Sequence, residues 1–200
     1  MTTQLVIASG NQGKIKEFNE MLTPHQLECV AQDKFNVPQV PETASTFVEN
    51  ALLKARNSCK YTKLPSIADD SGLVIPAIDN QPGLYSARFA GSGDDGANID
   101  KVLELMADIP REQRSAYYIS VIVYLQNAAD PTPIICQGIW HGSILTARIG
   151  DGGFGYDPIF GVSSHKMSAA QLPSSIKNTI SHRYIAMAQL VKHLQHKMQA

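Results

Sequence analysis

The sequence has few cysteines, no excess of charge of either sign and no long hydrophobic run. Its three cysteines, Cys29, Cys59 and Cys136, are widely spaced and form no C-x-x-C pair. This spacing argues against a disulfide framework or a zinc site and predicts reduced packing residues. Seventeen Lys and Arg residues oppose eighteen Asp and Glu residues, for a net charge of −1. Because no global positive field attracts nucleic acid or an anionic membrane, any recognition of phosphate must be local.

No segment reads as a membrane span or a signal peptide. The longest apolar run, ISVIVYL at residues 119–125, is far shorter than a spanning helix, and no basic region precedes the apolar residues near the start. We therefore expect a cytoplasmic protein. What the chain does have is 200 residues, of which 44% are hydrophobic, and this is enough to bury a full core.

Strands and helices alternate at both ends of the chain, around a middle rich in strands. Apolar patterns predict strands over 4–8 and 27–31, a helix over 14–22, a helix over 97–107, several strands between 115 and 149, and a last helix over 179–198. Another helix is expected after Thr46, because Thr46 and Glu49 have the spacing of a capping box. Its apolar stripe would comprise Phe47, Ala51, Ala55 and Cys59.

These elements predict one domain over residues 1–200. The expected class is α/β, with two lobes and a central mixed β-sheet flanked by helices. A cleft between the lobes is the expected active site.

Two adjacent carboxylates, Asp69 and Asp70, follow Ile67 and Ala68 where a strand is expected to end. Such a pair is costly to bury and repels itself, so it must be solvated, capped or bound to a cation. In extended backbone successive side chains point to opposite faces, so only one of the two can face a given cleft. A polar strand end and a metal or acid–base site both remain open on these residues alone.

Two glycine-rich segments fail as nucleotide motifs. GSGDDG (91–96) places Asp94 and Asp95 where a pyrophosphate would lie, and SGNQGKI (9–15) lacks the first glycine and the Ser or Thr of a Walker A loop. SGNQGK still offers backbone N–H groups, hydroxyl and amide groups and Lys14 at a strand-to-helix turn, which suits either a phosphate or an ordinary polar turn.

Two later segments also allow two readings each. DGGFGYDP (151–158) carries two aromatic residues in glycine-rich backbone. It can lay a ring against a base, or it can form a tight turn with core aromatics. SHR (181–183), with Lys177 upstream, supplies either ligand donors or a basic surface patch.

Taken together, six segments in order resemble the inosine/xanthosine triphosphate pyrophosphatases. They are SGNQGKIKE, PETASTFVENALLKA, IADDSG, PGLYSARFAG, GGFGYDPIF and SHR, and the likeness runs from Leu5 to Arg183. The resemblance implies a homodimer of two-lobed α/β subunits. It also implies that the enzyme uses Mg²⁺ to hydrolyse ITP, dITP and XTP to the nucleoside monophosphate and pyrophosphate. The chain departs from the usual family pattern in LPSSIK (172–177) and at Tyr184.

The resemblance also implies roles for individual residues. Asp70 would be the catalytic general base and a metal ligand, with Glu42 as a second ligand and Asp69 as a supporting carboxylate of the metal site. Phe154 would stack on the base, and His182 and Arg183 would donate to its C6 oxygen. The implied substrate-binding residues are Ser9, Gly10, Asn11, Gln12, Gly13, Lys14, Lys54, Ser71, Phe154, Gly155, Tyr156, Asp157, Lys177, His182 and Arg183.

Two alternatives stay open. One is a pyrophosphatase similar to the Maf proteins, acting on pyrimidine or modified nucleotides, although GGFGYDP and SHR favour the purine family. The other is a module that binds nucleotides without hydrolysing them. The expected partners are a purine nucleoside triphosphate and a second copy of the chain, with no nucleic acid and no membrane.

Overall fold

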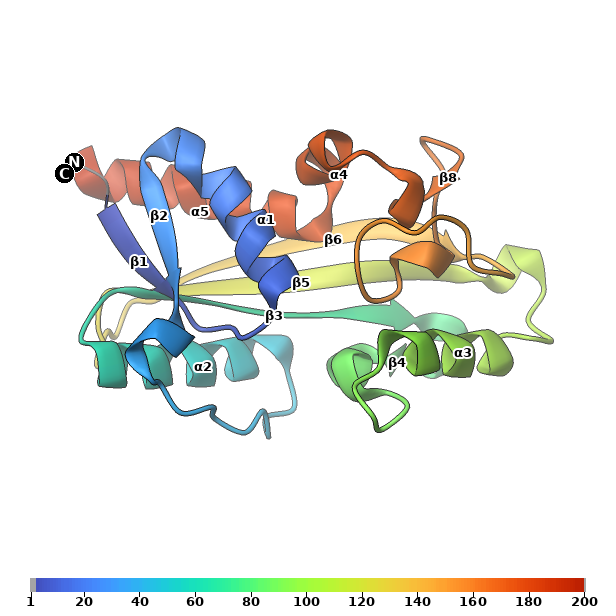
Figure 1. The fold of residues 1–200 in the computed structure, drawn as a ribbon, viewed down its shortest axis with the longest axis horizontal. Coiled ribbons are helices and arrows are strands. Elements are labelled where there is room, and N and C mark those ends of the chain that lie inside the picture. Colours follow the sequence, from blue (N-terminus) through green and yellow to red (C-terminus); the bar gives the residue numbers. More distant parts are fainter. Residues whose placement is uncertain (1–2, 200) are drawn as a thin grey trace. The chain divides into compact units, whose positions relative to one another are not determined.

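The computed structural model describes residues 3–199, with side chains for residues 4–197, and it has an α/β fold (Figure 1). One mixed sheet of eight strands has the order β2-β1-β3-β5-β6-β7-β8, with β4 paired to β3 off this path. The strands are β1 (Thr3–Ile7), β2 (Leu27–Ala31), β3 (Ser66–Ile75), β4 (Gln81–Pro82), β5 (Ser115–Leu125), β6 (Ile134–Ile144), β7 (Phe160–Val162) and β8 (Met167–Ser168). The helices are α1 (Gln12–Leu22), α2 (Phe47–Thr62), α3 (Asp95–Leu105), α4 (Ser174–Ile180) and α5 (His182–Gln199). The predicted mixed sheet flanked by helices is therefore confirmed.

The chain divides into two compact units. Unit 1 comprises Met1–Asp70, Ser120–Gly138 and Arg183–Ala200, and unit 2 comprises Ser71–Ile119 and Ile139–His182. Strands β3, β5 and β6 each contribute residues to both units. The cleft expected between two lobes stays a prediction.

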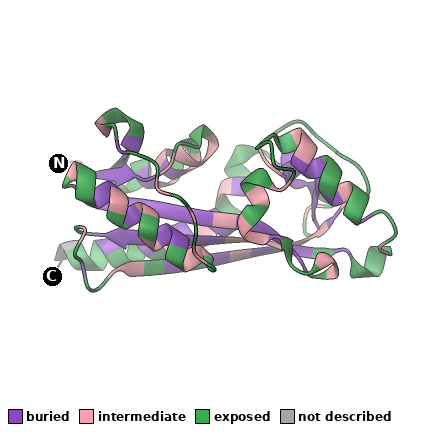
Figure 2. Cartoon of the chain, turned by 90° about the horizontal axis from the view of Figure 1, so that it is seen from below, coloured by how far each residue is buried: buried purple, intermediate pink, exposed green. Residues whose placement is uncertain are grey.

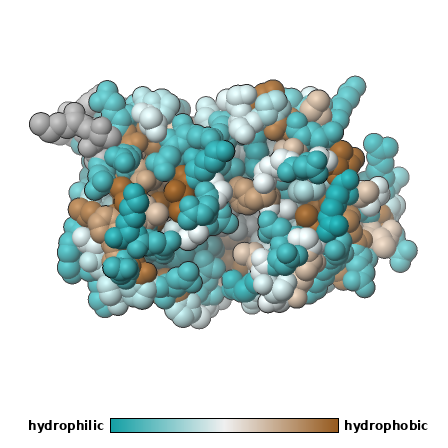
Figure 3. Space-filling model, viewed as in Figure 1, coloured by the Kyte–Doolittle hydropathy of each residue, from teal (hydrophilic) through white to brown (hydrophobic). Residues whose placement is uncertain are grey.

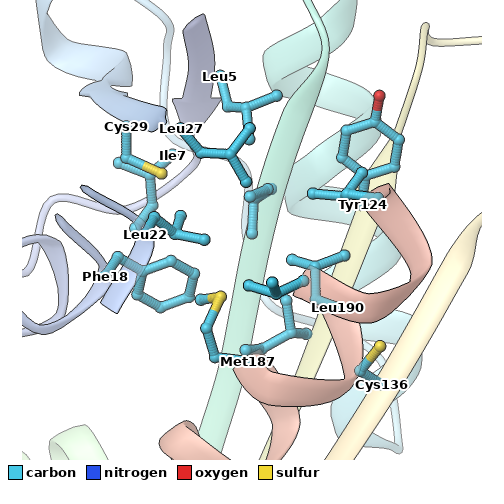
Figure 4. Close-up of a cluster of buried hydrophobic side chains, with 14 of the residues drawn as sticks. Leu5, Ile7, Phe18, Leu22, Leu27, Cys29, Tyr124, Cys136, Met187 and Leu190 are labelled. Carbon is cyan, nitrogen blue, oxygen red and sulfur yellow. The ribbon is translucent and has the colours of Figure 1, made fainter. Parts of the chain in front are cut away.

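In unit 1, helices cover both faces of the sheet. Strand β1 pairs in parallel with both β2 and β3, and α1 and α5 pack on one face of these strands, as Figure 4 shows for their buried side chains. That cluster includes Leu5, Ile7, Phe18, Leu22, Cys29, Met187 and Leu190. Helix α2 packs on the opposite face, where Ala51, Ala55 and Cys59 meet Ala8, Ala68, Val123 and Leu125.

The alternation of side chains along β3 and β5 explains this division. Ile67 belongs to the cluster under α1 and α5, whereas its neighbour Ala68 belongs to the cluster under α2. Ile122 and Val123 divide in the same way. Because successive side chains of a strand point to opposite faces, the same rule fixes the faces of the residues that follow.

Unit 2 has its own core, in which aromatic rings pack among aliphatic side chains. Tyr118 and Trp140 come from β5 and β6, and the ring of Phe160 lies 4.6 Å from that of Tyr118 and 5.0 Å from that of Trp140. Buried residues of α3, among them Ile99 and Val102, pack against the same cluster. Strand β7 pairs antiparallel with β6 and with β8 at this end of the sheet.

Burial follows the layers. The strands are mostly buried and the outer sides of the helices are exposed (Figure 2). The face drawn in Figure 3 is largely hydrophilic, with hydrophobic residues in small groups. All three cysteines are buried and free of disulfides, which agrees with their predicted role as packing residues. Among the described residues, none of the helices is long and apolar enough to span a membrane.

Three predictions about the elements were wrong. Strand β3 does not end at the carboxylate pair but continues to Ile75, because cationic side chains described below balance the buried charge. Residues 145–149 form no strand, because the backbone bends at Thr146 and Ala147, although the N–H groups of Leu145 and Ile149 donate to the carbonyls of Ile159 and Pro158. The last helix begins at His182 rather than at residue 179, since Ser181 has extended backbone (φ −69°, ψ 159°) as helix-capping residues do.

Candidate functional site

Asp69 and Asp70 lie inside β3, on opposite faces of the sheet. The carboxylate of Asp69 contacts side chains of α1 and α5, and that of Asp70 contacts side chains of α2. The expectation that only one of the two can face a given side is thereby confirmed. The two acids have different partners and different chemistry.

Asp69 is held by cations from both helices on its face. Its Oδ2 lies 2.6 Å from the ammonium of Lys14 and 3.4 Å from the guanidinium of Arg183. Its Oδ1 accepts a hydrogen bond of 2.5 Å from the hydroxyl of Ser120. Arg183 pairs as well with the carboxylate of Glu17 on α1. The side chain of Asp69 is 0% exposed and that of Arg183 is 2% exposed, so these residues form a buried ionic cluster.

The charges of this cluster depend on one another. Burial opposes ionisation of Asp69, but Lys14 and Arg183 outweigh it and hold the pKa of the Asp69 carboxyl well below its usual range. Burial lowers the pKa of Lys14, against the opposing effect of Asp69. Asp69 therefore serves to keep the ammonium of Lys14 charged.

On the other face, the ammonium of Lys54 joins two carboxylates. It donates to Oδ1 of Asp70 at 2.7 Å, to Oε1 of Glu42 at 2.8 Å and to the backbone carbonyl of Asp69 at 2.8 Å. The amide of Asn50 donates to Oδ2 of Asp70 at 3.3 Å, while its own oxygen accepts from the N–H of Ala44. Helix α2 therefore presents Asn50 and Lys54, one turn apart, to Asp70.

Burial sets Asp70 apart from its neighbour. Burial raises the pKa of the Asp70 carboxyl, and the attraction of Lys54 only partly opposes this. Burial also opposes the charge of Lys54, but Asp70 and Glu42 outweigh it and raise the pKa of the ammonium. A carboxylate with a raised pKa is a better proton acceptor than an ordinary surface aspartate.

The segment from Ser9 to Lys14 comprises the connection after β1 and the first residues of α1. The hydroxyl of Ser9 accepts from the N–H of Asn11 at 3.1 Å, and the side chain of Asn11 caps α1 by accepting from the N–H of Lys14 at 3.0 Å. Gly10 and Gln12 are exposed, and Gly13 is half-buried in the first turn of α1. A helix start of this kind, with a lysine beside it, suits an anion.

A second set of predicted residues lies together in unit 2. The carboxylate of Asp157 accepts from the N–H of Phe154 at 3.0 Å and from the ammonium of Lys177 at 2.7 Å. That ammonium lies 5.0 Å from the centre of the Phe154 ring. Tyr156 is buried, and its hydroxyl donates to the carbonyl of Ser86 at 2.8 Å. Residues 151–158 therefore form a turn that is fixed by hydrogen bonds, and this turn holds the half-buried ring of Phe154.

The remaining predicted residues are placed as follows. Ser71 is half-buried and is the first residue of unit 2 in β3. The ring of His182 stacks on Tyr118 at 4.7 Å, with an interplanar angle of 11°, inside unit 2. Arg183 belongs to unit 1, with the carboxylates of Glu17 and Asp69. That both side chains read a nucleobase stays a prediction.

The donor set of Glu42 and Asp70 fits a hard divalent cation. Within the described part of the chain, no three His, Cys, Asp or Glu residues gather as a complete set of metal ligands. Glu42 and Asp70 nevertheless converge on one positive charge, the ammonium of Lys54. Mg²⁺ is typically held by one or two carboxylates together with water and substrate phosphates, so two protein ligands are sufficient.

The sequence patterns missed four supporting residues. Asn50 donates to Asp70 and Ser120 donates to Asp69. Glu17 pairs with Arg183, which also contacts Asp69. Asp95 accepts from the N–H of Gly155. For Asn50 a signal was present, because it lies four residues before Lys54 on the same face of a helix. For Ser120 and Glu17 no local pattern pointed to the partner.

The fold and the two lysine–carboxylate clusters define an α/β protein that can hold an anion beside Lys14 and place a carboxylate base close to Lys54 in unit 1. The chain belongs to the Ham1 family, whose model matches residues 5–193.

Similar proteins cover nearly the whole chain. A protein of Xanthomonas campestris pv. campestris named dITP/XTP pyrophosphatase is 51% identical over 197 residues, which is 98% of this chain and 97% of that protein. A Vibrio cholerae protein of the same name is 48% identical over 94% of this chain and 95% of its own length. The solved structure of a HAM1 protein from Coxiella burnetii has a TM-score of 0.89 and 45% identity, and it covers 97% of this chain and 99% of that one.

Proposed function

We propose that this protein hydrolyses non-canonical purine nucleoside triphosphates, such as ITP, dITP and XTP, to the monophosphate and pyrophosphate. The names of relatives about 50% identical over nearly their full length support the substrate class. The observation that carries the chemistry is Asp70, a buried carboxylate beside Glu42 and Lys54. Its raised pKa suits a base that removes a proton from water.

Residues of unit 1 have separate roles in binding and hydrolysing the triphosphate. Lys14 and the start of α1 bind phosphate oxygens, because both carry positive charge and N–H donors. Asp69 keeps Lys14 charged rather than binding metal, since its oxygens already accept from Lys14, Ser120 and Arg183.

On the opposite face, Asp70 accepts the proton of the attacking water, while Lys54 offsets the charge that develops on phosphate oxygens. Glu42 and Asp70 would hold Mg²⁺, which when bound supplies positive charge that lowers the pKa of the attacking water.

Four residues of unit 2 and Arg183 of unit 1 select the base. Phe154 stacks on the purine, and Lys177 and Asp157 fix the loop that carries it. His182 and Arg183 donate hydrogen bonds to the C6 oxygen of hypoxanthine or xanthine, where adenine carries an amino donor instead. We keep the homodimer and the cytoplasmic location as parts of this proposal.

The test is a pyrophosphate-release screen over ITP, dITP, XTP, GTP, dTTP and UTP with the wild type and Asp70→Asn. Preferred release from ITP, dITP and XTP, with turnover reduced by about a thousandfold or more in the variant, would support the proposal, because the variant lacks the base. Preference for dTTP or UTP would favour the Maf-like alternative. Tight binding without release would identify a nucleotide-binding module. Wild-type turnover in Asp70→Asn would overturn the assigned base.

A further inference from the structure

The loop that carries Phe154 depends on two glycines with left-handed backbone. Gly153 has φ +76° and Gly155 has φ +60°, values that side chains disfavour. A Cβ atom at Gly153 would lie 2.0 Å from the carboxylate of Asp157. Glycine allows this turn, but it also leaves the unbound loop many alternative conformations. A contact from outside the loop is therefore needed to hold the backbone of Gly155 in one conformation.

That restriction comes from a residue sixty positions earlier. The carboxylate of Asp95, the first residue of α3, accepts a hydrogen bond of 2.7 Å from the N–H of Gly155. Its neighbour Asp94 has another task, because it caps α3 by accepting from the N–H of Ala97 at 2.7 Å. The two adjacent acids of GSGDDG fit no nucleotide motif but have separate roles. Asp94 caps the start of α3, and Asp95 holds the loop at Gly155.

The start of α3 is itself braced. The guanidinium of Arg148 donates to the carbonyl of Gly96 at 2.8 Å and pairs with the carboxylate of Asp100 at 2.9 Å. Asp95 therefore projects from a fixed helix end within unit 2. A hydrogen bond from a fixed acceptor holds Gly155 in one conformation before any ligand arrives, and such preorganisation favours binding.

We propose that Asp95 is a positioning residue for the nucleobase, acting through the N–H of Gly155 on the adjacent ring of Phe154. The inference rests on the proposed function, in which Phe154 stacks on the purine. Loss of Asp95 weakens nucleotide binding and leaves the chemistry at Asp70 unchanged, because Asp70 and its partners belong to unit 1. Stacking does not distinguish one purine from another, so ITP and XTP are affected alike.

The kinetic test compares Asp95→Ala, Asp95→Asn and Glu104→Ala. We expect Asp95→Ala to raise KM for ITP and XTP about tenfold, as loss of one hydrogen bond to a charged acceptor implies, with kcat within about twofold of wild type. Asp95→Asn keeps an acceptor oxygen and should restore most of the affinity. Glu104→Ala removes the same charge from an exposed position of α3 outside the brace and should leave KM unchanged. Unchanged KM in Asp95→Ala, or an equal rise in Glu104→Ala, would overturn the proposal.

A second measurement does not depend on activity. Amide hydrogen exchange followed by NMR should show the Gly155 N–H protected in wild type and exchanging at least fivefold faster in Asp95→Ala, but not in Glu104→Ala. Unprotected Gly155 in wild type would overturn the contact itself. If wild type releases no pyrophosphate from any nucleotide while Gly155 is protected, the proposed function fails and the positioning of the loop stands.

Discussion

Neutralising Asp69 should destabilise the protein far more than a typical surface change. Asp69→Asn keeps the shape of the side chain, but it takes the counter-charge from the ammonium of Lys14 and the guanidinium of Arg183, both next to a fully buried carboxylate. Breaking a buried ion pair by removing one partner costs about 3–5 kcal/mol. Because Arg183 keeps Glu17, we expect the lower end of this range, about 3 kcal/mol.

The assay is urea unfolding followed by circular dichroism, in a double-mutant cycle with Lys14→Met. Removing both charges relieves the penalty of the unpaired ammonium, so the double variant should be more stable than the sum of the single effects predicts, by about 2 kcal/mol. Ser120→Ala is the milder control and should cost about 1 kcal/mol, because it removes a hydrogen bond to Asp69 without removing a charge. Additivity of the two charge variants within about 0.5 kcal/mol would refute the reasoning.

Three further outcomes follow from the structure. Asp130 accepts from the N–H groups of Gln126 and Thr132, and these hydrogen bonds hold the pKa of its carboxyl below the usual value. A carboxyl whose pKa is lower in the folded than in the unfolded state stabilises the protein above about pH 4. This stabilisation is lost as the pH falls through the folded-state pKa. Asp130→Asn should therefore cost about 1 kcal/mol in urea unfolding at pH 7 and less at pH 3, and an equal cost at both would contradict this. EDTA should abolish turnover, and excess Mg²⁺ should restore it without a change in circular dichroism, so activity that resists EDTA would contradict the metal role of Glu42 and Asp70. Turnover should rise from pH 6 toward pH 9, since the attacking water must lose its proton and a bound metal lowers the pKa of that water, whereas a pH–rate profile with an optimum below pH 6 would rule this chemistry out.

The local patterns were sufficient to predict most elements. Strand β2 has the predicted bounds, and α1 and α2 were predicted from apolar periodicity. Thr46 caps α2 as expected, accepting from the N–H of Glu49, although the carboxylate of Glu49 accepts from the hydroxyl of Thr46 rather than from its backbone. These features depend on residues within one or two turns of each other, so a sequence reveals them.

The long-range contacts of charged side chains could not be predicted from residue patterns. Glu17 and Arg183 are separated by 166 positions and Asp95 and Gly155 by sixty, and nothing in either local sequence identifies the partner. The prediction that β3 ends at its acidic residues failed for the same reason. Two carboxylates can lie inside a buried strand only when distant cations compensate them, and the strand itself does not encode those cations.

The opposite orientation of the two acids of β3 also limits which insertions and deletions the gene can tolerate. Ser66 and Ile67 pair with β1 and fix the register of β3. Deleting one residue between this pairing and the acids would turn each carboxylate to the other face of the sheet and bring Asp70 toward Lys14 and Arg183. A change of two residues would keep each acid on its face but would shift both acids along the strand. Insertions or deletions at this point must therefore involve an even number of residues to keep each acid on its face, whereas loops elsewhere in the chain are not restricted in this way.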